Sequence, residues 1–206
     1  MKAPLKIDGK ADEPAWAAAP PVSFATADAY LRFKGKEGAR TDAADLAGSL
    51  RLLWDEKALY LFVTATDDRF VPPREADKLW AGDSVQMLAD PFRQQADKLG
   101  KYDYSFGLAP AGATAWCHYS AESNAPIGEA ADIQVAVARD DQAGVTRYEI
   151  AIPWTRLSPF APAPGADLGL TVILNEDDGP GREGIIGWFG GVHLKEVDMV
   201  GDAILE

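Results

Sequence analysis

Short runs in which apolar and polar residues alternate constrain the fold of this chain more than any other feature. The runs ADIQVAVARDD (131–141) and GVTRYEIAIPW (144–154) both alternate in this way. Successive side chains of a β-strand point to opposite faces, so a period of two predicts strands with one buried face. Turn clusters such as RDDQAG, APAPGAD and EDDGPGREG lie between the runs. This pattern predicts an all-β fold, a β-sandwich of two antiparallel sheets of the immunoglobulin or jelly-roll kind, with only short helical turns.

Individual runs predict where the strands face. SLRLLWDEKALYLFVTATDD predicts a hairpin with Leu50, Leu52 and Trp54 on one face, and GVTRYEIAIPW predicts that Glu149 points away from the core. LGLTVILNEDD is apolar almost throughout, which is typical of a strand covered on both sides, and the final GDAILE also indicates a strand. DEPAWAAAP and PWTRLSPF predict short helical turns, and residues 25–47 predict a long loop.

The chain shows no internal repeat and no linker rich in Gly and Ser. A length of 206 residues suits one sandwich, so a single domain spanning 1–206 is predicted. No apolar run has the length of a signal peptide or a transmembrane helix. The abrupt ends fit a module of a larger protein and equally fit a complete small cytoplasmic protein.

Charge excludes two classes of partner. The formal net charge is −12, so the chain lacks the basic surface that nucleic acid requires, and an anionic membrane surface is disfavoured for the same reason. Neutral ligands, cationic ligands and divalent metal ions stay open. The single cysteine, Cys117, excludes an intrachain disulfide but does not identify the compartment.

The residues that carry most enzyme chemistry are scarce. His118 and His193 are the only histidines, so a His-rich zinc site is not available. Cys117 precedes His118 in AWCHYS, but neighbours in a strand face opposite sides and are badly placed as nucleophile and base. No phosphate-binding glycine loop occurs either. The sequence therefore argues against a self-contained enzyme.

Acidic clusters at the ends of predicted strands suggest a calcium site. Ca²⁺ takes six to eight oxygen ligands, which loops of this kind supply. Solvated turns are the alternative interpretation of each cluster. The candidate metal ligands are Asp12, Asp67, Asp68, Glu176, Asp177 and Asp178.

Trp80 lies in an unusual place, in the polar stretch DKLWAGDSVQMLADP just before a predicted strand. A flat indole face stacks well on the C–H face of a sugar ring, so Trp80 is either a ligand platform or an anchor for its loop. Trp16 is expected to pin the N-terminal segment, and Trp154 to lie in the core. Trp116 and Trp188 are either buried or facing a groove.

The motifs together resemble the family 9 carbohydrate-binding modules and their wider DOMON-like relatives. IDGKADEPAW resembles the opening motif of that family, LRLLWDEKALYLFVTATDD its central hairpin, and LWAGDSVQMLADP its tryptophan loop and following strand. YEIAIPWTRL and LGLTVILNEDD followed by GIIGW resemble its later strands. The resemblance implies a β-sandwich, a non-catalytic role, often bound calcium, and attachment to secreted glycoside hydrolases.

The resemblance also implies a sugar site, which this chain matches in part. Trp80 matches the first of two tryptophans that sandwich a sugar, and Gln86 stands where a glutamate binds it. The second tryptophan is missing, with Phe189 and His193 as the rings available, and Ser105 stands near an expected arginine. The candidate ligand-binding residues are Trp80, Gln86, Tyr104, Trp188 and His193.

The sequence leaves three alternative functions for this chain. The first is a non-catalytic module that binds polysaccharide or oligosaccharide, as part of a larger extracellular or periplasmic protein. The second is a structural or interaction domain that has lost sugar binding and docks on the catalytic domain of its parent enzyme. The third comes from haem-binding relatives and uses Met87 with His118 or His193.

Overall fold

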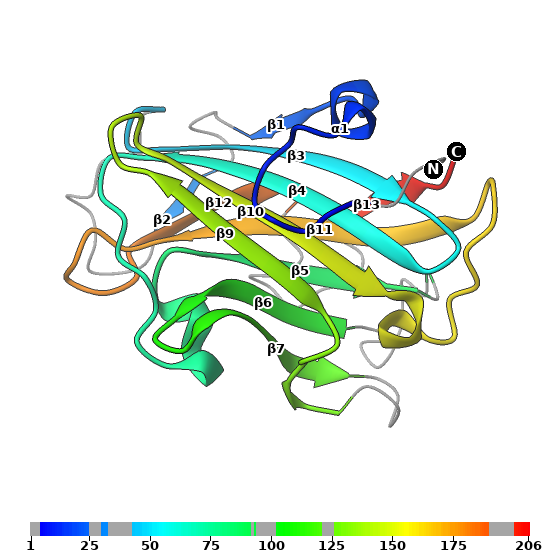
Figure 1. Ribbon diagram of the computed structural model, residues 1–206. Coiled ribbons are helices and arrows are strands. Elements are labelled where there is room, and N and C mark those ends of the chain that lie inside the picture. The colour runs from blue at the N-terminus through cyan, green and yellow to red at the C-terminus, as the bar shows by residue number, and fades with distance from the viewer. Residues whose placement is uncertain are drawn as a thin grey trace.

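The computed structural model describes residues 5–24, 30–32, 43–91, 93, 102–120, 126–189 and 200–206, with the backbone alone for 30–32. Its strands form two sheets, and every paired neighbour is antiparallel (Figure 1). The five-stranded sheet has the order β1 (Val22–Phe24), β3 (Leu46–Trp54), β4 (Ala58–Asp67), β10 (Val145–Pro153), β9 (Gln134–Asp140). The eight-stranded sheet has the order β2 (Tyr30–Arg32), β12 (Gly184–Trp188), β11 (Asp167–Glu176), β5 (Ser84–Asp90), β6 (Tyr102–Ala109), β7 (Gly112–Ser120), β8 (Gly128–Glu129), and β13 (Gly201–Ile204) also pairs with β11.

The helices are short and lie at strand ends. They are α1 (Pro14–Ala18), η2 (Ala76–Ala81) and η3 (Trp154–Leu157). No helix in the described part of the chain is long and apolar enough to cross a membrane. The predicted all-β sandwich of two antiparallel sheets is confirmed.

The main core fills the space between the two sheets. Every second residue of each central strand points inward, as the alternating pattern predicts. On the eight-stranded side the inward residues include Val85, Met87, Tyr104, Phe106 and Val172, each fully buried. Leu50 is buried opposite them, and Leu52 and Trp54 pack against the same core, so the predicted face of the hairpin is confirmed.

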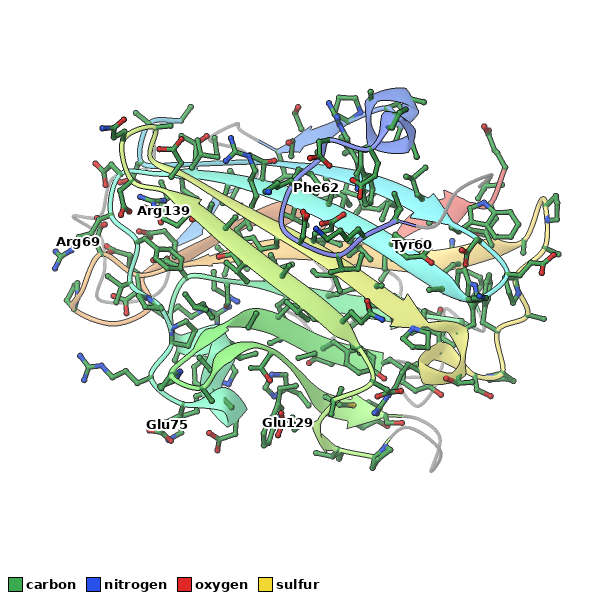
Figure 2. The ribbon with its side chains drawn as sticks, in the orientation of Figure 1. Tyr60, Phe62, Arg69, Glu75, Glu129 and Arg139 are labelled. Atoms are coloured by element: carbon green, nitrogen blue, oxygen red, sulfur yellow. The ribbon has the colours of Figure 1, made fainter. Side chains whose placement is uncertain are left out.

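The N-terminal segment covers the outer face of the five-stranded sheet (Figure 1). Trp16 is fully buried there, with its ring centroid 5.5 Å from that of Phe62, which Figure 2 labels on β4. The carboxylate of Glu149 accepts hydrogen bonds from the backbone N–H groups of Asp8 and Gly9 and from Trp16 Nε1, each at 2.9 Å. Burial raises the pKa of Glu149. The side chain therefore points away from the core, as predicted, yet is itself buried under a second layer.

Most other strand and turn predictions are confirmed, with one correction. Strand β11 is buried on both faces apart from its first residue, β13 forms at the C-terminal end, and Trp154 is 6% exposed. The predicted loop over residues 25–47 is wrong in part, because residues 30–32 form β2 and Leu46 begins β3. A three-residue edge strand is too short to show a period of two. The other positions from 25 to 42 lie outside the described residues.

Candidate functional site

A row of polar and aromatic residues crosses the outer face of the eight-stranded sheet. Gln86 on β5 pairs with Ser105 on β6, and Ser105 pairs with Trp116 on β7. Val85 and Met87 point into the core, so Gln86 between them points outward. Residues paired directly across neighbouring strands point to the same face of a sheet, so Ser105 and Trp116 point outward as well. The sheet therefore presents an amide, a hydroxyl and an indole side by side.

Hydrogen bonds hold the polar members of this row in place. Gln86 Nε2 donates to Asp103 Oδ1 at 2.9 Å, and His118 Nε2 lies 2.9 Å from Ser105 Oγ. Gln86 is 5% exposed and Ser105 is fully buried. These polar side chains are therefore held in place but are nearly inaccessible to a ligand.

The structure separates Cys117 from His118, as predicted for neighbours in a strand. Cys117 is buried in the core, whereas His118 contacts Ser105 on the outer face. Met87 is likewise buried in the core. Met87 and His118 therefore lie on opposite faces of one sheet, which contradicts the Met87–His118 form of the haem alternative, and His193, its other histidine, lies outside the described residues.

Trp80 lies on η2, which crosses the outer face near β5 to β8. Leu79 is fully buried and anchors the helix, whereas Trp80 is 39% exposed. Gly82, two residues later, lies where two backbone segments approach closely: a Cβ there would be 2.7 Å from the carbonyl oxygen of Val71. The guanidinium carbon of Arg182 lies 5.8 Å from the centroid of the Trp80 ring. The indole of Trp80 is thus partly exposed, with the Arg182 guanidinium over its ring.

Arg182 is held beside Trp80 by a chain of hydrogen bonds. It donates to Asn175 Oδ1, and Asn175 Nδ2 donates to Ser84 Oγ at 2.9 Å. Ser84 Oγ in turn donates to the carbonyl oxygen of Leu79, at 2.7 Å, on η2. Burial lowers the pKa of Arg182 to about 10. The β11–β12 turn, β5 and η2 therefore form one rigid unit around the platform.

Only part of the predicted ligand site comes together. Trp80 and Gln86 share the outer face, whereas Tyr104 is fully buried in the core and donates from its hydroxyl to the carbonyl oxygen of Arg156, at 3.0 Å. Trp188 packs partly buried against the same core, with its ring centroid 5.2 Å from that of Phe189. Strand alternation places both on the inner side, which corrects their predicted place beside Trp80. His193 lies outside the described residues.

The structure adds residues that motif reasoning missed. Strand alternation could have placed Trp116, His118 and Asp103 outside, because their neighbours are apolar. Nothing local in the sequence places Arg182 against Trp80, since the two are far apart along the chain. The additional residues at this face are Asp103, Trp116, His118, Asn175 and Arg182.

Several carboxylates gather at the end of the sandwich where β4 and β11 end. The carboxylate oxygens of Asp45, Asp68 and Asp178 lie within 4.8 Å of one another. Those of Glu176, Asp178 and Glu183 do the same. Antiparallel pairing explains the convergence, because the start of β3 meets the end of β4, and the β11–β12 hairpin closes between Glu176 and Glu183.

The predicted metal ligands divide between these groups and their surroundings. Asp68, Glu176 and Asp178 belong to the groups, and Asp45 and Glu183 are additions that the sequence did not single out. The other predicted ligands lie outside these groups. Asp67 is buried beside them, and Asp12 is exposed in the N-terminal segment. Asp177 Oδ1 accepts hydrogen bonds from the N–H groups of Gly179 and Gly181.

Burial and mutual repulsion perturb the inner carboxyls. Burial, with the charge of Asp178 adding to it, raises the pKa of Asp67 to about 6. Burial and the charge of Asp67 raise the pKa of Asp83 to about 9, although its two oxygens accept hydrogen bonds from the N–H groups of Val71 and Asp177. A set of oxygen donors under mutual repulsion suits a hard divalent cation such as Ca²⁺.

The fold and this face define a class: a β-sandwich with aromatic and polar side chains on the outside of one sheet. The family model described as carbohydrate family 9 binding domain-like matches residues 7–206. The chain belongs to this family of carbohydrate-binding modules. Its members are non-catalytic, so the expectation that the chain is not an enzyme is confirmed.

Solved structures agree on the fold. A family 9 carbohydrate-binding module from Caldicellulosiruptor kristjanssonii in complex with cellotriose superposes with a TM-score of 0.72 at 17% identity, covering 99% of this chain and 90% of that one. The same kind of module from this organism in complex with glucose gives 0.71 at 17% identity, covering 99% and 92%. A putative carbohydrate-binding protein from Bacteroides uniformis gives 0.60 at 12%, covering 94% and 90%. No curated protein matches the chain.

Proposed function

We propose that the module binds a polysaccharide or oligosaccharide on the outer face of the eight-stranded sheet, with Trp80 as the aromatic platform. The observation that carries the proposal is the exposed indole of Trp80, fixed on η2 beside Arg182. An indole face suits the C–H face of a sugar ring, and it loses little rotamer entropy on binding.

Polar groups near the platform suit the hydroxyls of a sugar. Gln86 is 5% exposed and has an amide oxygen that can accept a hydrogen bond, whereas the amide of Asn175 is buried and bonded to Ser84 and Arg182, so that it supports the site from below. The complexes of the C. kristjanssonii modules with cellotriose and glucose support a sugar as the class of ligand.

The decisive experiment compares glycan binding by the wild type and by Trp80→Ala. The indole supplies most of the stacking area, so we expect at least about a tenfold loss of affinity, corresponding to about 1.4 kcal/mol, with the fold intact. Ile204→Ala, at a 61% exposed apolar residue on β13, is the control and should keep wild-type binding. Unchanged affinity of Trp80→Ala for a glycan that the wild type binds would refute the platform.

The natural setting follows from this function. We infer that the module is appended to a glycoside hydrolase or another polysaccharide-active enzyme, which acts outside the cell or in the periplasm and whose catalytic domain is its partner. The alternative, a structural domain that only docks on that enzyme, predicts silence across a broad glycan panel from folded, calcium-loaded protein.

We also propose that Ca²⁺ binds at the carboxylate groups. Asp178 belongs to both groups and would share the ion with Asp45 and Asp68 or with Glu176 and Glu183. The ion would supply charge neutralisation and rigidity to the β11–β12 turn, and no catalysis.

Calorimetry tests this. A ligand present at 100 times its Kd stabilises the folded state by about 2.7 kcal/mol. In a domain of this size that corresponds to a rise in Tm of about 5–11 °C. Asp178→Asn should abolish the rise, whereas Asp12→Asn, at an exposed carboxylate outside both groups, should keep it. Equal Tm values in CaCl₂ and in EDTA would contradict the proposal.

A further inference from the structure

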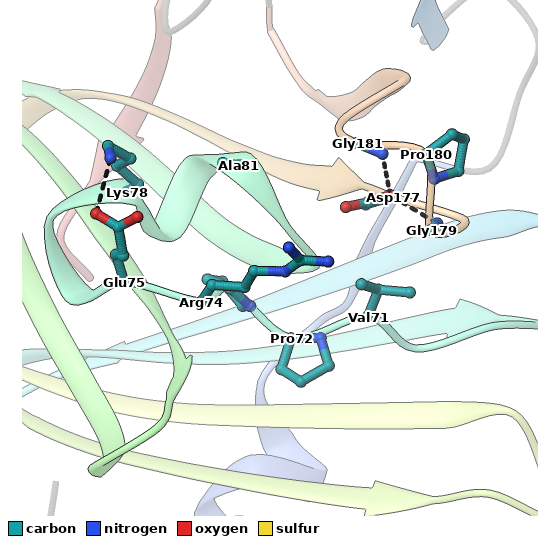
Figure 3. Close-up of a pocket in the computed structure, with 11 residues that line it drawn as sticks. Val71, Pro72, Arg74, Glu75, Lys78, Ala81, Asp177, Gly179, Pro180 and Gly181 are labelled. Atoms are coloured by element: carbon teal, nitrogen blue, oxygen red, sulfur yellow. Dashed lines mark hydrogen bonds and ion pairs between the residues drawn. The ribbon is translucent and has the colours of Figure 1, made fainter.

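A hollow of about 350 Å³ lies next to the Trp80 platform, between η2 and the turn after β11 (Figure 3). Its walls include Val71, Pro72, Arg74, Lys78, Ala81 and Pro180. Ala81 directly follows Trp80, and Gly181, which also lines the hollow, directly precedes Arg182. The hollow therefore lies next to the residues that carry the Trp80 and Arg182 side chains.

Of the two cationic side chains that line the hollow, Arg74 and Lys78, only Lys78 is paired with another described residue. Lys78 Nζ is paired with Glu75 at 2.7 Å, and the Asp177 carboxylate is occupied by two backbone N–H groups. Arg74, in contrast, makes no hydrogen bond or ion pair with any residue that the structure describes. Figure 3 shows its guanidinium extending between η2 and the turn. Hydrogen bonds from backbone N–H groups do not cancel the charge of Asp177, so the formal charges of the hollow balance, and Arg74 is the cation there that is not engaged in an ion pair with a described residue.

Arg182 does not supply a second cation to the hollow. It donates to Asn175, its guanidinium lies over the Trp80 ring, and the negative charge of Asp103 acts on it. Recognition of an anionic group in the hollow therefore depends on Arg74.

We propose that the module selects glycans that carry carboxylates, that is, uronic acid residues, with Arg74 contacting the carboxylate of the sugar that lies in the hollow next to Trp80. A guanidinium binds a carboxylate through two parallel hydrogen bonds. Val71 and the proline rings offer C–H surface to the rest of the sugar ring. The net charge of −12 repels polyanions at long range, so selectivity has to come from these contacts. This inference rests on the proposed glycan site.

Titration calorimetry at about 0.15 M salt, where the Debye length is about 8 Å, tests the inference. The probes are trimers of galacturonic acid and of mannuronic acid, each compared with its uncharged methyl ester, together with cellotriose. We expect at least one acidic trimer to bind about tenfold more tightly than its ester, since a hydrogen bond to a charged group contributes about 1.5–3 kcal/mol.

Arg74→Gln should remove about tenfold of the affinity for that acidic trimer and leave the affinity for its ester within about twofold. The control is Lys57→Gln, which makes the same change of net charge in the turn before β4, at the opposite end from the acidic groups. This variant should bind every probe as the wild type does.

Three results separate the two proposals. Equal binding of acids and esters, or an Arg74→Gln variant that binds acids as well as the wild type, overturns the selectivity for uronic acids. If Trp80→Ala then still abolishes binding of cellotriose, the glycan site itself stands. If no probe binds the folded wild type, the glycan site and the selectivity fall together.

Discussion

The carboxyl of Asp67 provides a quantitative test of the electrostatics at the acidic end. It is 3% exposed at the end of β4, and its pKa is raised to about 6, mainly by burial. The N–H group of Arg69, which donates to Asp67 Oδ1 at 2.7 Å, and the charge of Arg139 partly offset this effect. Replacing Asp67 by asparagine removes the charge and keeps an oxygen that can accept the bond from Arg69.

The sign and the size follow from linkage. The pKa of Asp67 is higher in the folded protein, at about 6, than its ordinary value of 3.8, so the folded state binds more protons between these values. The stability contributed by this group is therefore fully present below pH 3.8 and is lost as the pH rises through 6. At 1.36 kcal/mol per pKa unit, the loss is about 3 kcal/mol.

Urea unfolding in excess EDTA, from pH 4 to pH 8, measures this loss. We expect Asp67→Asn to gain about 3 kcal/mol in free energy of unfolding relative to the wild type across this range. Glu56→Gln, which makes the same charge change in the exposed turn at the other end of β4, controls for net charge. A difference between Asp67→Asn and the wild type that stays constant with pH, or that falls as the pH rises, would refute the reasoning.

Two further predictions concern other buried polar contacts. Glu149→Gln leaves one acceptor oxygen for three donors, so we expect the free energy of unfolding to fall by about 3 kcal/mol. Calorimetry should then show a fall in Tm of about 6–12 °C. An unchanged Tm would show that the N-terminal segment is held by packing alone. Asn175→Ala releases Arg182 from its position over Trp80, so we expect about a fivefold to tenfold loss of glycan affinity. Because Asn175 is buried and bonded to both Ser84 and Arg182, we also expect the free energy of unfolding to fall by about 1–3 kcal/mol. Intrinsic tryptophan fluorescence follows the glycan binding, and wild-type affinity would contradict the role of Asn175.

The sequence predicts the strands well where they are long and have one buried face. The runs at 134–140 and 145–153 alternate because one side of each packs on the core. The short strand β2 carries too few residues for a period to be read. Glu149 shows a second limit: alternation predicts which way a side chain points, but not that a segment about 140 residues earlier in the chain covers it.

The residues of the candidate site also differ in how far the sequence predicts them. Trp80 is predictable because its motif is local, a polar loop followed by a strand, and the family resemblance adds Gln86. Tyr104 and Trp188 were placed by resemblance, and alternation along their own strands turns them inward. The contact of Arg182 with Trp80 depends on how the turn after β11 folds over η2, which no local pattern encodes.

Asp83 links the acidic end of the sandwich to the proposed glycan face through hydrogen bonds. Its carboxylate accepts hydrogen bonds from the N–H of Val71, which lines the hollow, and from the N–H of Asp177, where the turn bearing Arg182 begins. A cation held by Glu176 and Asp178 would therefore act on the same turn that positions Arg182. Coupling of this kind is reciprocal in free energy, so a cation that tightens glycan binding must itself bind more tightly, by the same factor, when the glycan is present. The test measures the affinity for the cation with and without glycan, and the affinity for glycan with and without the cation. These four values form one thermodynamic cycle. If Asp83 links the two sites, the coupling free energy in this cycle is different from zero.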